Sequence, residues 1–178
     1  LAYYSCPMLC HFVADGLAKG LAGLSLPIGD RYQVLTVSID PNDTLDQLHK
    51  FKNQYVSFLP EDLKSYWHFW TGSFDSISKL AETLGFKYRF NKKTRQFSHS
   101  AVIFVLTPTG TLSRYLYGIE FPPFDLKLSI LEALDQRSIK TIESVLLFCY
   151  NYNPQDKKYV LYARNIMKIS GFLTIIML

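Results

Sequence analysis

Leu1-Ala-Tyr-Tyr-Ser-Cys6-Pro-Met-Leu-Cys10 is the stretch of sequence that decides the fold. Its first five residues have the character of the end of a buried strand, whereas Pro7 suits the first turn of a helix. After Cys10, apolar side chains recur every three or four residues, at Val13, Leu17, Leu21 and Leu24. This spacing predicts a helix that packs one face on a sheet. The two cysteines therefore stand between a strand and a helix.

Strand and helix signals alternate in the next part of the chain. Residues 32–40 are rich in β-branched and aromatic side chains, which predicts a short central strand of a parallel sheet. Either Asp43 or Thr44 is expected to cap the helix that follows. A second short strand is predicted at residues 67–70, before a helix that ends at Gly85.

The later part of the chain predicts an antiparallel hairpin and a last helix. In residues 86–90 aromatic side chains alternate with basic ones, which is typical of an edge or hairpin strand. Residues 101–106 and 111–117 flank a Thr-Pro-Thr-Gly turn, and residues 126–134 carry a helical apolar pattern. The order is β-α-β-α-β-β-α. With two cysteines after the first strand, it predicts a thioredoxin-like α/β fold, a central mixed β-sheet flanked by helices.

Length and composition favour one domain with extensions. A chain of 178 residues with 48% hydrophobic and 15% aromatic residues can bury one sizeable core. The thioredoxin-like domain is assigned to residues 1–137, with its first strand truncated at the N-terminus, and a C-terminal extension to residues 138–170. Residues 171–178 are an uninterrupted apolar run, shorter than the ~20 residues of a membrane span. They are interpreted either as the start of a truncated transmembrane anchor or as a short apolar terminal element.

Charge and cysteine content exclude two classes of protein. The net charge of +4 is modest, and Lys92-Lys93 and Lys157-Lys158 are the only adjacent pairs of basic residues. No nucleic-acid partner is therefore predicted. The three cysteines cannot all pair within the chain, so a disulfide-stapled scaffold is not expected.

The two cysteines of the CxxxC motif have their own chemistry. Cys6 and Cys10, at i and i+4 across a helix N-terminus, lie near unpaired backbone N–H groups, which favour thiolate over thiol. Thiolates are soft ligands that select Cu(I), Zn(II) or iron–sulfur clusters. Three intervening residues also permit a disulfide, although the usual redox motif has two. The spacing alone leaves metal binding, thiol redox chemistry and simple packing open.

A distant histidine favours metal binding among these alternatives. His99 stands directly before the strand at residues 101–106, where thioredoxin-like redox enzymes carry a cis-proline opposite the cysteines. This sequence has no proline between Pro60 and Pro108. A neutral imidazole there would complete a Cys2His site. The alternative is a surface histidine at the start of a strand.

Four motifs occur together between residue 1 and about residue 135. They are Tyr4-Ser-Cys6-Pro-Met-Leu-Cys10, Val34-Leu-Thr-Val-Ser-Ile-Asp40-Pro-Asn-Asp-Thr44, Phe97-Ser-His99 and Val105-Leu-Thr-Pro-Thr-Gly110. In this order they resemble the Sco/SenC family. The resemblance implies a thioredoxin-like domain in which Cys6, Cys10 and His99 bind one copper ion.

The same resemblance implies a function and a location. Members of the family are copper-binding assembly factors that deliver copper to the dinuclear site of cytochrome oxidase subunit II. They are not enzymes, apart from an auxiliary thiol–disulfide reductase activity. They are tethered to a membrane on its extracytoplasmic side, so the bacterial periplasm is the expected location. The expected partner is cytochrome oxidase subunit II or a similar copper protein.

The chain also departs from the family pattern. His11 stands where many members have proline after the second cysteine. It could compete as a ligand, but it is interpreted as a solvent-facing residue of the first helical turn. Asp40 and Asp43 match an acidic motif of the family. A strand end and a helix cap would explain both, and the alternative is a role in docking a partner or beside the metal. Cys149 is expected to be a small buried residue in the C-terminal extension.

The residues leave a second function open. A thiol–disulfide oxidoreductase or redox sensor would use the same Cys6 and Cys10 pair, with Cys6 as the attacking thiolate because it lies nearer the helix start. A peroxidase-like or purely structural domain is the third alternative. It is disfavoured because no arginine lies near Cys6 in the sequence.

Overall fold

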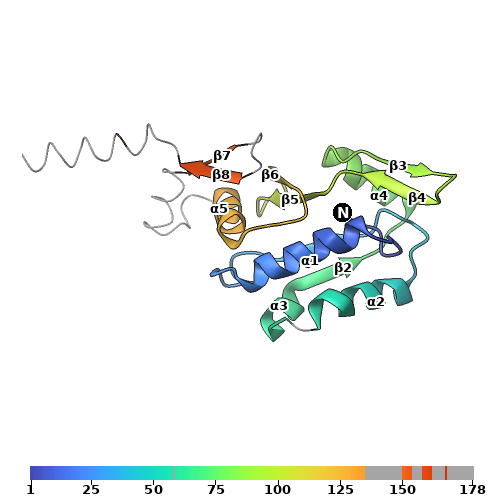
Figure 1. Cartoon of the computed structure of the whole chain (residues 1–178), viewed down its shortest axis with the longest axis horizontal. Coiled ribbons are helices and arrows are strands. Elements are labelled where there is room, and N and C mark those ends of the chain that lie inside the picture. The colour runs from blue at the N-terminus through green and yellow to red at the C-terminus, as the bar shows by residue number, and fades with distance from the viewer. Residues whose placement is uncertain (58, 135–149, 154–157, 162–166, 168–178) are drawn as a thin grey trace, which may run out of the picture.

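The computed structural model describes residues 1–57, 59–134, 150–153, 158–161 and 167 (Figure 1). Its elements follow the predicted order, except that a helix at residues 61–66 and a strand at residues 96–99 were not predicted. The first half contains α1 (Leu9–Ala22), β1 (Val34–Val37), α2 (Leu45–Val56), α3 (Glu61–Tyr66), β2 (Trp67–Trp70) and α4 (Phe74–Thr83). The second half contains β3 (Tyr88–Asn91), β4 (Gln96–His99), β5 (Val102–Leu106), β6 (Leu112–Tyr117) and α5 (Pro123–Ala133). Two further strands, β7 (Tyr150–Asn153) and β8 (Lys158–Leu161), form an antiparallel pair near α5.

The residues before the cysteine motif lie beside β1. β1 and β2 pair in parallel, from Val34 opposite Trp67 to Val37 opposite Trp70. On its other side, the chain at Ala2 forms a parallel bridge with Ser38, in which the Ala2 N–H donates to the Val37 carbonyl over 3.1 Å. Residues 2–4 are buried, as expected for the end of a strand within a core. The motif that follows is therefore held at the carboxyl end of the parallel pair.

The second half supplies two antiparallel hairpins. β3 pairs with β4, and β5 pairs with β6. The mixed α/β arrangement is as predicted, and it is thioredoxin-like. Hydrogen bonds nevertheless join the described strands only in pairs. A cavity of about 660 Å³, lined by apolar side chains of β1, β5 and α1, separates the parallel pair from the β5–β6 hairpin.

The helix starts show which polar residues act as caps. Thr44 caps α2, because its hydroxyl accepts the Gln47 N–H over 3.3 Å while the Gln47 side chain accepts the Thr44 N–H over 2.7 Å. Asp43, the other predicted cap, has a different role described below. Pro7 does not lie in the first turn of α1, because that helix begins at Leu9 and Met8 occupies its N-cap position without a capping side chain.

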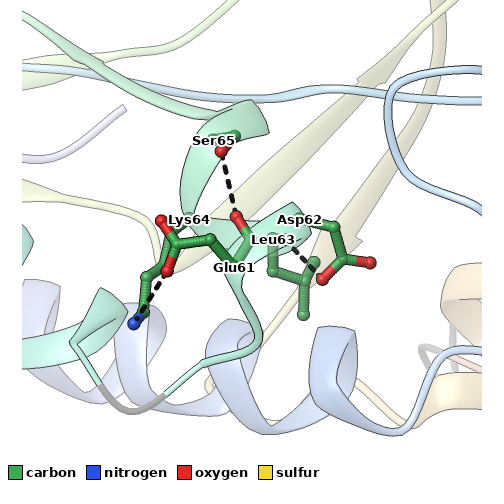
Figure 2. Close-up of polar contacts among 5 residues, drawn as sticks. All are labelled: Glu61, Asp62, Leu63, Lys64 and Ser65. Atoms are coloured by element: carbon green, nitrogen blue, oxygen red, sulfur yellow. Dashed lines mark hydrogen bonds and ion pairs between the residues drawn. The ribbon is translucent and has the colours of Figure 1, made fainter.

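A short helix that was not predicted leads into β2. In α3, Lys64 forms an ion pair with Glu61 at 3.3 Å, and the Ser65 hydroxyl donates to the Glu61 carbonyl over 3.0 Å (Figure 2). Asp62 accepts the N–H of the next residue, Leu63, which is buried. The exposed face of α3 is thus polar, while Leu63 anchors it to the core.

The helices pack on the core with the faces that the sequence indicated. α1 packs against α2 and α5, with Leu21 buried as predicted and Val13, Leu17 and Leu24 half-buried, while Ala18 is fully buried. α5 covers β5 and β6 and buries Leu126 and Leu131. The helix predicted up to Gly85 is α4, which ends at Thr83.

Much of the predicted C-terminal extension lies outside the described residues. Cys149 and the apolar run at 171–178 both fall there, so the expectations about them stay predictions. Within the described part of the chain, no helix is long and apolar enough to cross a membrane.

Candidate thiol and metal site

The sulfur of Cys6 accepts one of the free backbone N–H groups at the start of α1. The backbone N–H of Cys10 donates to the Sγ of Cys6 over 3.3 Å. The first N–H groups of a helix have no partner within the helix, and Met8 offers no capping side chain, so the sulfur takes that place. Both cysteines are free thiols and both are buried, with 5% of Cys6 and 2% of Cys10 exposed.

The two thiols differ in acidity because of the way they contact each other. Several contacts together lower the pKa of Cys6 to about 5, against the opposing effect of burial. The hydrogen bond from the Cys10 side chain has the largest effect, and the backbone N–H groups of Cys10 and Met8 and the Tyr3 side chain add to it. The same contact, together with burial, raises the pKa of Cys10 far above its usual range. At neutral pH, Cys6 is therefore a thiolate and Cys10 a thiol.

His99 contacts this pair from a strand 89 residues away in sequence. Its Nε2 lies 3.4 Å from Cys10 Sγ, and its Nδ1 lies 3.0 Å from the Ser100 carbonyl oxygen. Since a carbonyl only accepts, Nδ1 carries the proton, and the Nε2 lone pair faces the sulfur. That tautomer is the one required for an imidazole that binds a metal through Nε2.

Aromatic rings enclose His99. The ring of Tyr3 lies edge-on to it with 6.1 Å between ring centroids, and Phe86 lies 5.6 Å away on a tilted plane. Tyr3 also packs against Phe97, two residues before His99 in β4. Tyr3 hydrogen bonds to Cys6 as well, so one buried tyrosine contacts both sides of the site. No motif in the sequence marks Tyr3, although its position three residues before Cys6 is a usable signal.

The three predicted ligands, Cys6, Cys10 and His99, lie next to one another, but they are not arranged around a common metal position. Cys6 and Cys10 are linked through the Cys10 N–H, and Cys10 touches His99. In the described part of the chain, no group of three or more His, Cys, Asp or Glu side chains is arranged so that it could hold a metal ion. The donors are two sulfurs and one imidazole nitrogen, which is the soft set that suits Cu(I).

Asp43 holds the chain in front of the motif. Its Oδ2 accepts the Tyr4 N–H over 2.6 Å and the Ser38 hydroxyl over 2.5 Å, while its Oδ1 is buried without a hydrogen-bond partner. The carboxylate thus ties the cysteine segment to the end of β1, and it does not cap α2. Asp40 is different, because its Oδ1 accepts the backbone and side-chain N–H groups of Asn42 in an exposed turn.

Replacement of Asp43 by alanine should lower the free energy of unfolding by about 1–3 kcal/mol, because it leaves the buried Tyr4 N–H without its acceptor and removes the shorter hydrogen bond of the Ser38 hydroxyl. The matched control is Asp40→Ala, which removes only exposed turn contacts and should cost under ~1 kcal/mol. Urea unfolding followed by circular dichroism measures both variants. Equal losses for the two variants would contradict the assigned role of Asp43.

His11 was predicted to face solvent, but its side chain packs against α2 instead. Its Nδ1 hydrogen bonds to the Tyr55 hydroxyl, and its ring packs 5.3 Å from that of Phe51. These contacts tie the start of α1 to α2, because a side chain in the first turn of α1 lies on the face that packs on α2. In the described structure His11 is thus held on the helix interface, away from the ligand role that the sequence left open.

The fold and the site define a class: a thioredoxin-fold protein that carries a buried pair of free thiols in contact with a histidine from a distant strand. Within that class the SCO1/SenC family model matches residues 1–134, so this chain belongs to the SCO1/SenC family. The match ends close to the predicted domain limit at residue 137. A comparison with curated protein sequences finds no match.

Solved structures with the same fold include members of that family. A SCO1/SenC family lipoprotein from Bacillus anthracis str. Ames is 20% identical, with a TM-score of 0.58 over 74% of this chain and 75% of that one. Arabidopsis thaliana ScoI, solved with copper bound, gives the same identity and TM-score over 74% of this chain and 78% of its own. A protein from Aquifex aeolicus VF5 reaches a TM-score of 0.63 at 23% identity, over 74% and 73% of the two chains. At these identities the likeness shows the fold alone.

Proposed function

We propose that this chain binds copper through Cys6, Cys10 and His99 and delivers it to the dinuclear copper site of cytochrome oxidase subunit II. The observation that carries the proposal is the contact between Cys10 Sγ and His99 Nε2, at 3.4 Å, beside the Cys6 thiolate. Membership of the SCO1/SenC family and the copper bound by the Arabidopsis relative support it.

The protonation state of the site prepares it for Cu(I). Cys6 is already a thiolate and the Nε2 lone pair of His99 is already free, so two donors need no proton loss. Only Cys10 has to give up its proton when the metal enters between it and His99. The cavity beside Cys10 leaves room for the small side-chain movement that closes the three donors around one ion.

Delivery then needs no change of oxidation state. Thiolates of the recipient replace Cys6, Cys10 and His99 one at a time as ligands of Cu(I), and a proton returns to Cys10 as the metal leaves. The protein acts as a carrier of copper rather than as an enzyme. Burial of both sulfurs keeps water and oxidants away from the cargo before a partner docks.

The proposed place of action is the extracytoplasmic side of a membrane, with the bacterial periplasm as the compartment. The Bacillus anthracis relative is a lipoprotein, which supports tethering to a membrane. Membrane-bound oxidase subunits expose their copper site on that side, so a tether would keep donor and recipient close together.

The direct test is an anaerobic titration of the reduced protein with Cu(I) against a chromophoric chelator. We expect one tightly bound equivalent and its transfer to the reduced, copper-free soluble domain of cytochrome oxidase subunit II. Absence of tight stoichiometric binding would refute the copper site, whereas binding without transfer would refute delivery to this recipient.

A second candidate function rests on the unequal acidity of the two thiols. The Cys6 thiolate would attack a disulfide of the partner and form a mixed disulfide, and Cys10, after losing its proton to His99 Nε2, would displace the partner. The partner gains two electrons: one of its sulfurs becomes a thiol by taking the Cys10 proton back from His99, and the other leaves as a thiolate that takes a proton from solvent. Cys6 and Cys10 become a disulfide. Disulfide reduction that survives His99→Ala but not Cys6→Ser, with no tight copper binding, would favour this function.

A further inference from the structure

The β3–β4 hairpin is a preformed, exposed projection next to the site. Figure 1 shows it beside the N-terminal end of α1, and its second strand ends with His99. Asn91 orders the turn, because its side-chain oxygen accepts the Lys93 N–H over 2.9 Å and its carbonyl accepts the Arg95 N–H over 2.8 Å. The hairpin therefore presents its turn residues in a defined arrangement.

Five basic side chains gather on this hairpin or directly before it. They are Lys87, Arg89, Lys92, Lys93 and Arg95, and all five are exposed. None of them forms an ion pair within the described part of the chain, whose ion pairs involve other residues. The sequence contains no Asp or Glu from residue 83 to residue 119, so nothing on the hairpin offsets this charge.

An aromatic face connects the same hairpin to the candidate ligands. Phe90 is 46% exposed near the turn and packs 5.0 Å from Phe97. Phe97 in turn packs 5.3 Å from Tyr3, whose ring contacts His99. In the antiparallel register, Phe90 lies opposite Phe97 and Tyr88 lies opposite His99, so these rings share one face of the hairpin. A partner that covers this face would lie over His99.

We propose that the β3–β4 hairpin is the docking surface for an acidic patch on the protein that receives copper from this site. The proposal rests on the proposed function and names the chemistry of its partner. Unpaired cations with no acidic neighbour attract a surface of opposite charge and speed its approach. Exposed aromatic and arginine side chains are the types that protein interfaces bury. A recipient that docks on this hairpin would lie next to His99, whose Nε2 contacts Cys10 Sγ.

The variant that tests the surface is Lys92→Gln/Lys93→Gln, which removes two charges from the turn and keeps the backbone contacts of Asn91. The matched control is Lys50→Gln/Lys52→Gln, which makes the same change in net charge on α2. Calorimetry measures the affinity of each copper-free, reduced protein for the soluble domain of cytochrome oxidase subunit II at low and high salt.

At low salt we expect the hairpin variant to bind this domain about 5- to 20-fold more weakly than the wild type, with a smaller salt dependence. The control should stay within about twofold. Phe90→Ala should weaken binding about tenfold at both salt concentrations, because its contribution is not electrostatic. Equal affinities for the hairpin variant and the control, or no association of the wild-type protein with the domain, would overturn the proposal.

Two further measurements separate this proposal from the others. The affinity for Cu(I), measured by competition with a chelator, should be the same in all variants. If the wild type binds no copper but the hairpin variant still binds the domain more weakly than the wild type does, the proposed copper function is wrong and the docking surface is supported. Sedimentation with phosphatidylglycerol vesicles tests an anionic membrane as the occupant. Vesicle binding that depends on Lys92 and Lys93, with unchanged affinity for the domain, would overturn the proposal in favour of a lipid surface.

Discussion

Replacement of His99 by alanine should weaken Cu(I) binding by about 100-fold or more while the protein stays folded. The loss follows from removal of the only proposed nitrogen donor, which leaves the metal with two sulfurs. His99 is half-buried at a strand end, and its packing with Tyr3 and Phe86 is a small part of the core, so the thermal midpoint should fall by only a few degrees. Chelator competition under anaerobic conditions measures the affinity.

The matched control for His99→Ala is His49→Ala. His49 is exposed on α2, and its loss should leave Cu(I) affinity unchanged. If His99→Ala and His49→Ala bound Cu(I) equally well, the proposed Cys2His ligand set would be wrong. If His99→Ala were unfolded, His99→Phe would replace it as the test, because a phenyl ring can keep the packing with Tyr3 and Phe86 but offers the metal no donor atom.

Replacement of Cys10 by alanine should raise the pKa of Cys6 from about 5 toward the ordinary value of a cysteine, because the Cys10 side chain makes the largest contribution to lowering it. Thiolate absorbance near 240 nm of the reduced, metal-free protein measures this change. In the wild type, one thiol should ionise near pH 5 and the second should stay protonated through neutral pH. In Cys10→Ala, the thiolate signal at pH 6 should fall at least tenfold.

Cys10→Ser is the control for this titration. A serine hydroxyl keeps a hydrogen-bond donor in nearly the same place, so Cys6 should remain acidic in this variant. A Cys6 pKa that is unchanged in Cys10→Ala would show that the helix N–H groups, rather than the neighbouring thiol, stabilise the thiolate.

The same shift has a consequence for stability. The pKa of Cys6 is lower in the folded state than in the unfolded state, so its contribution is fully present above the unfolded value of about 8.5 and is lost as the pH falls through about 5. Between about pH 5 and about pH 8.5 the contribution of Cys6 to the free energy of unfolding of the reduced protein should therefore increase as the pH rises. Cys10→Ala should flatten this dependence.

The sequence predicted the element order well because each signal is local. The apolar spacing after Cys10 specifies α1, the Thr44-to-Gln47 pattern specifies a capping box, and a Thr-Pro-Thr-Gly turn between two β-rich runs specifies the β5–β6 hairpin. Two predictions were wrong. Pro7 lies before α1 rather than in it, which is a local difference in where the helix begins, whereas His11 is held by Tyr55 across the helix interface instead of facing solvent.

The basic hairpin shows a related limit. In the sequence the basic residues looked scattered, because Lys87, Arg89 and Arg95 are not adjacent to one another or to the Lys92-Lys93 pair. Antiparallel pairing of β3 with β4 folds this stretch back on itself and brings the charges onto one projection. It also places their aromatic neighbours on the face that leads to His99.

The sequence by itself determined the CxxxC motif at a helix start, and with it a pair of thiols beside free N–H groups, because the spacing of the cysteines and the free N–H groups of a helix are properties of one short segment. Only the tertiary structure decided that His99 lies against this pair and what holds the motif in place. Those features depend on a 3.4 Å contact between residues 89 positions apart, and on a carboxylate, Asp43, that reaches back to Tyr4. Such contacts arise from how strands and helices pack, which no single segment encodes.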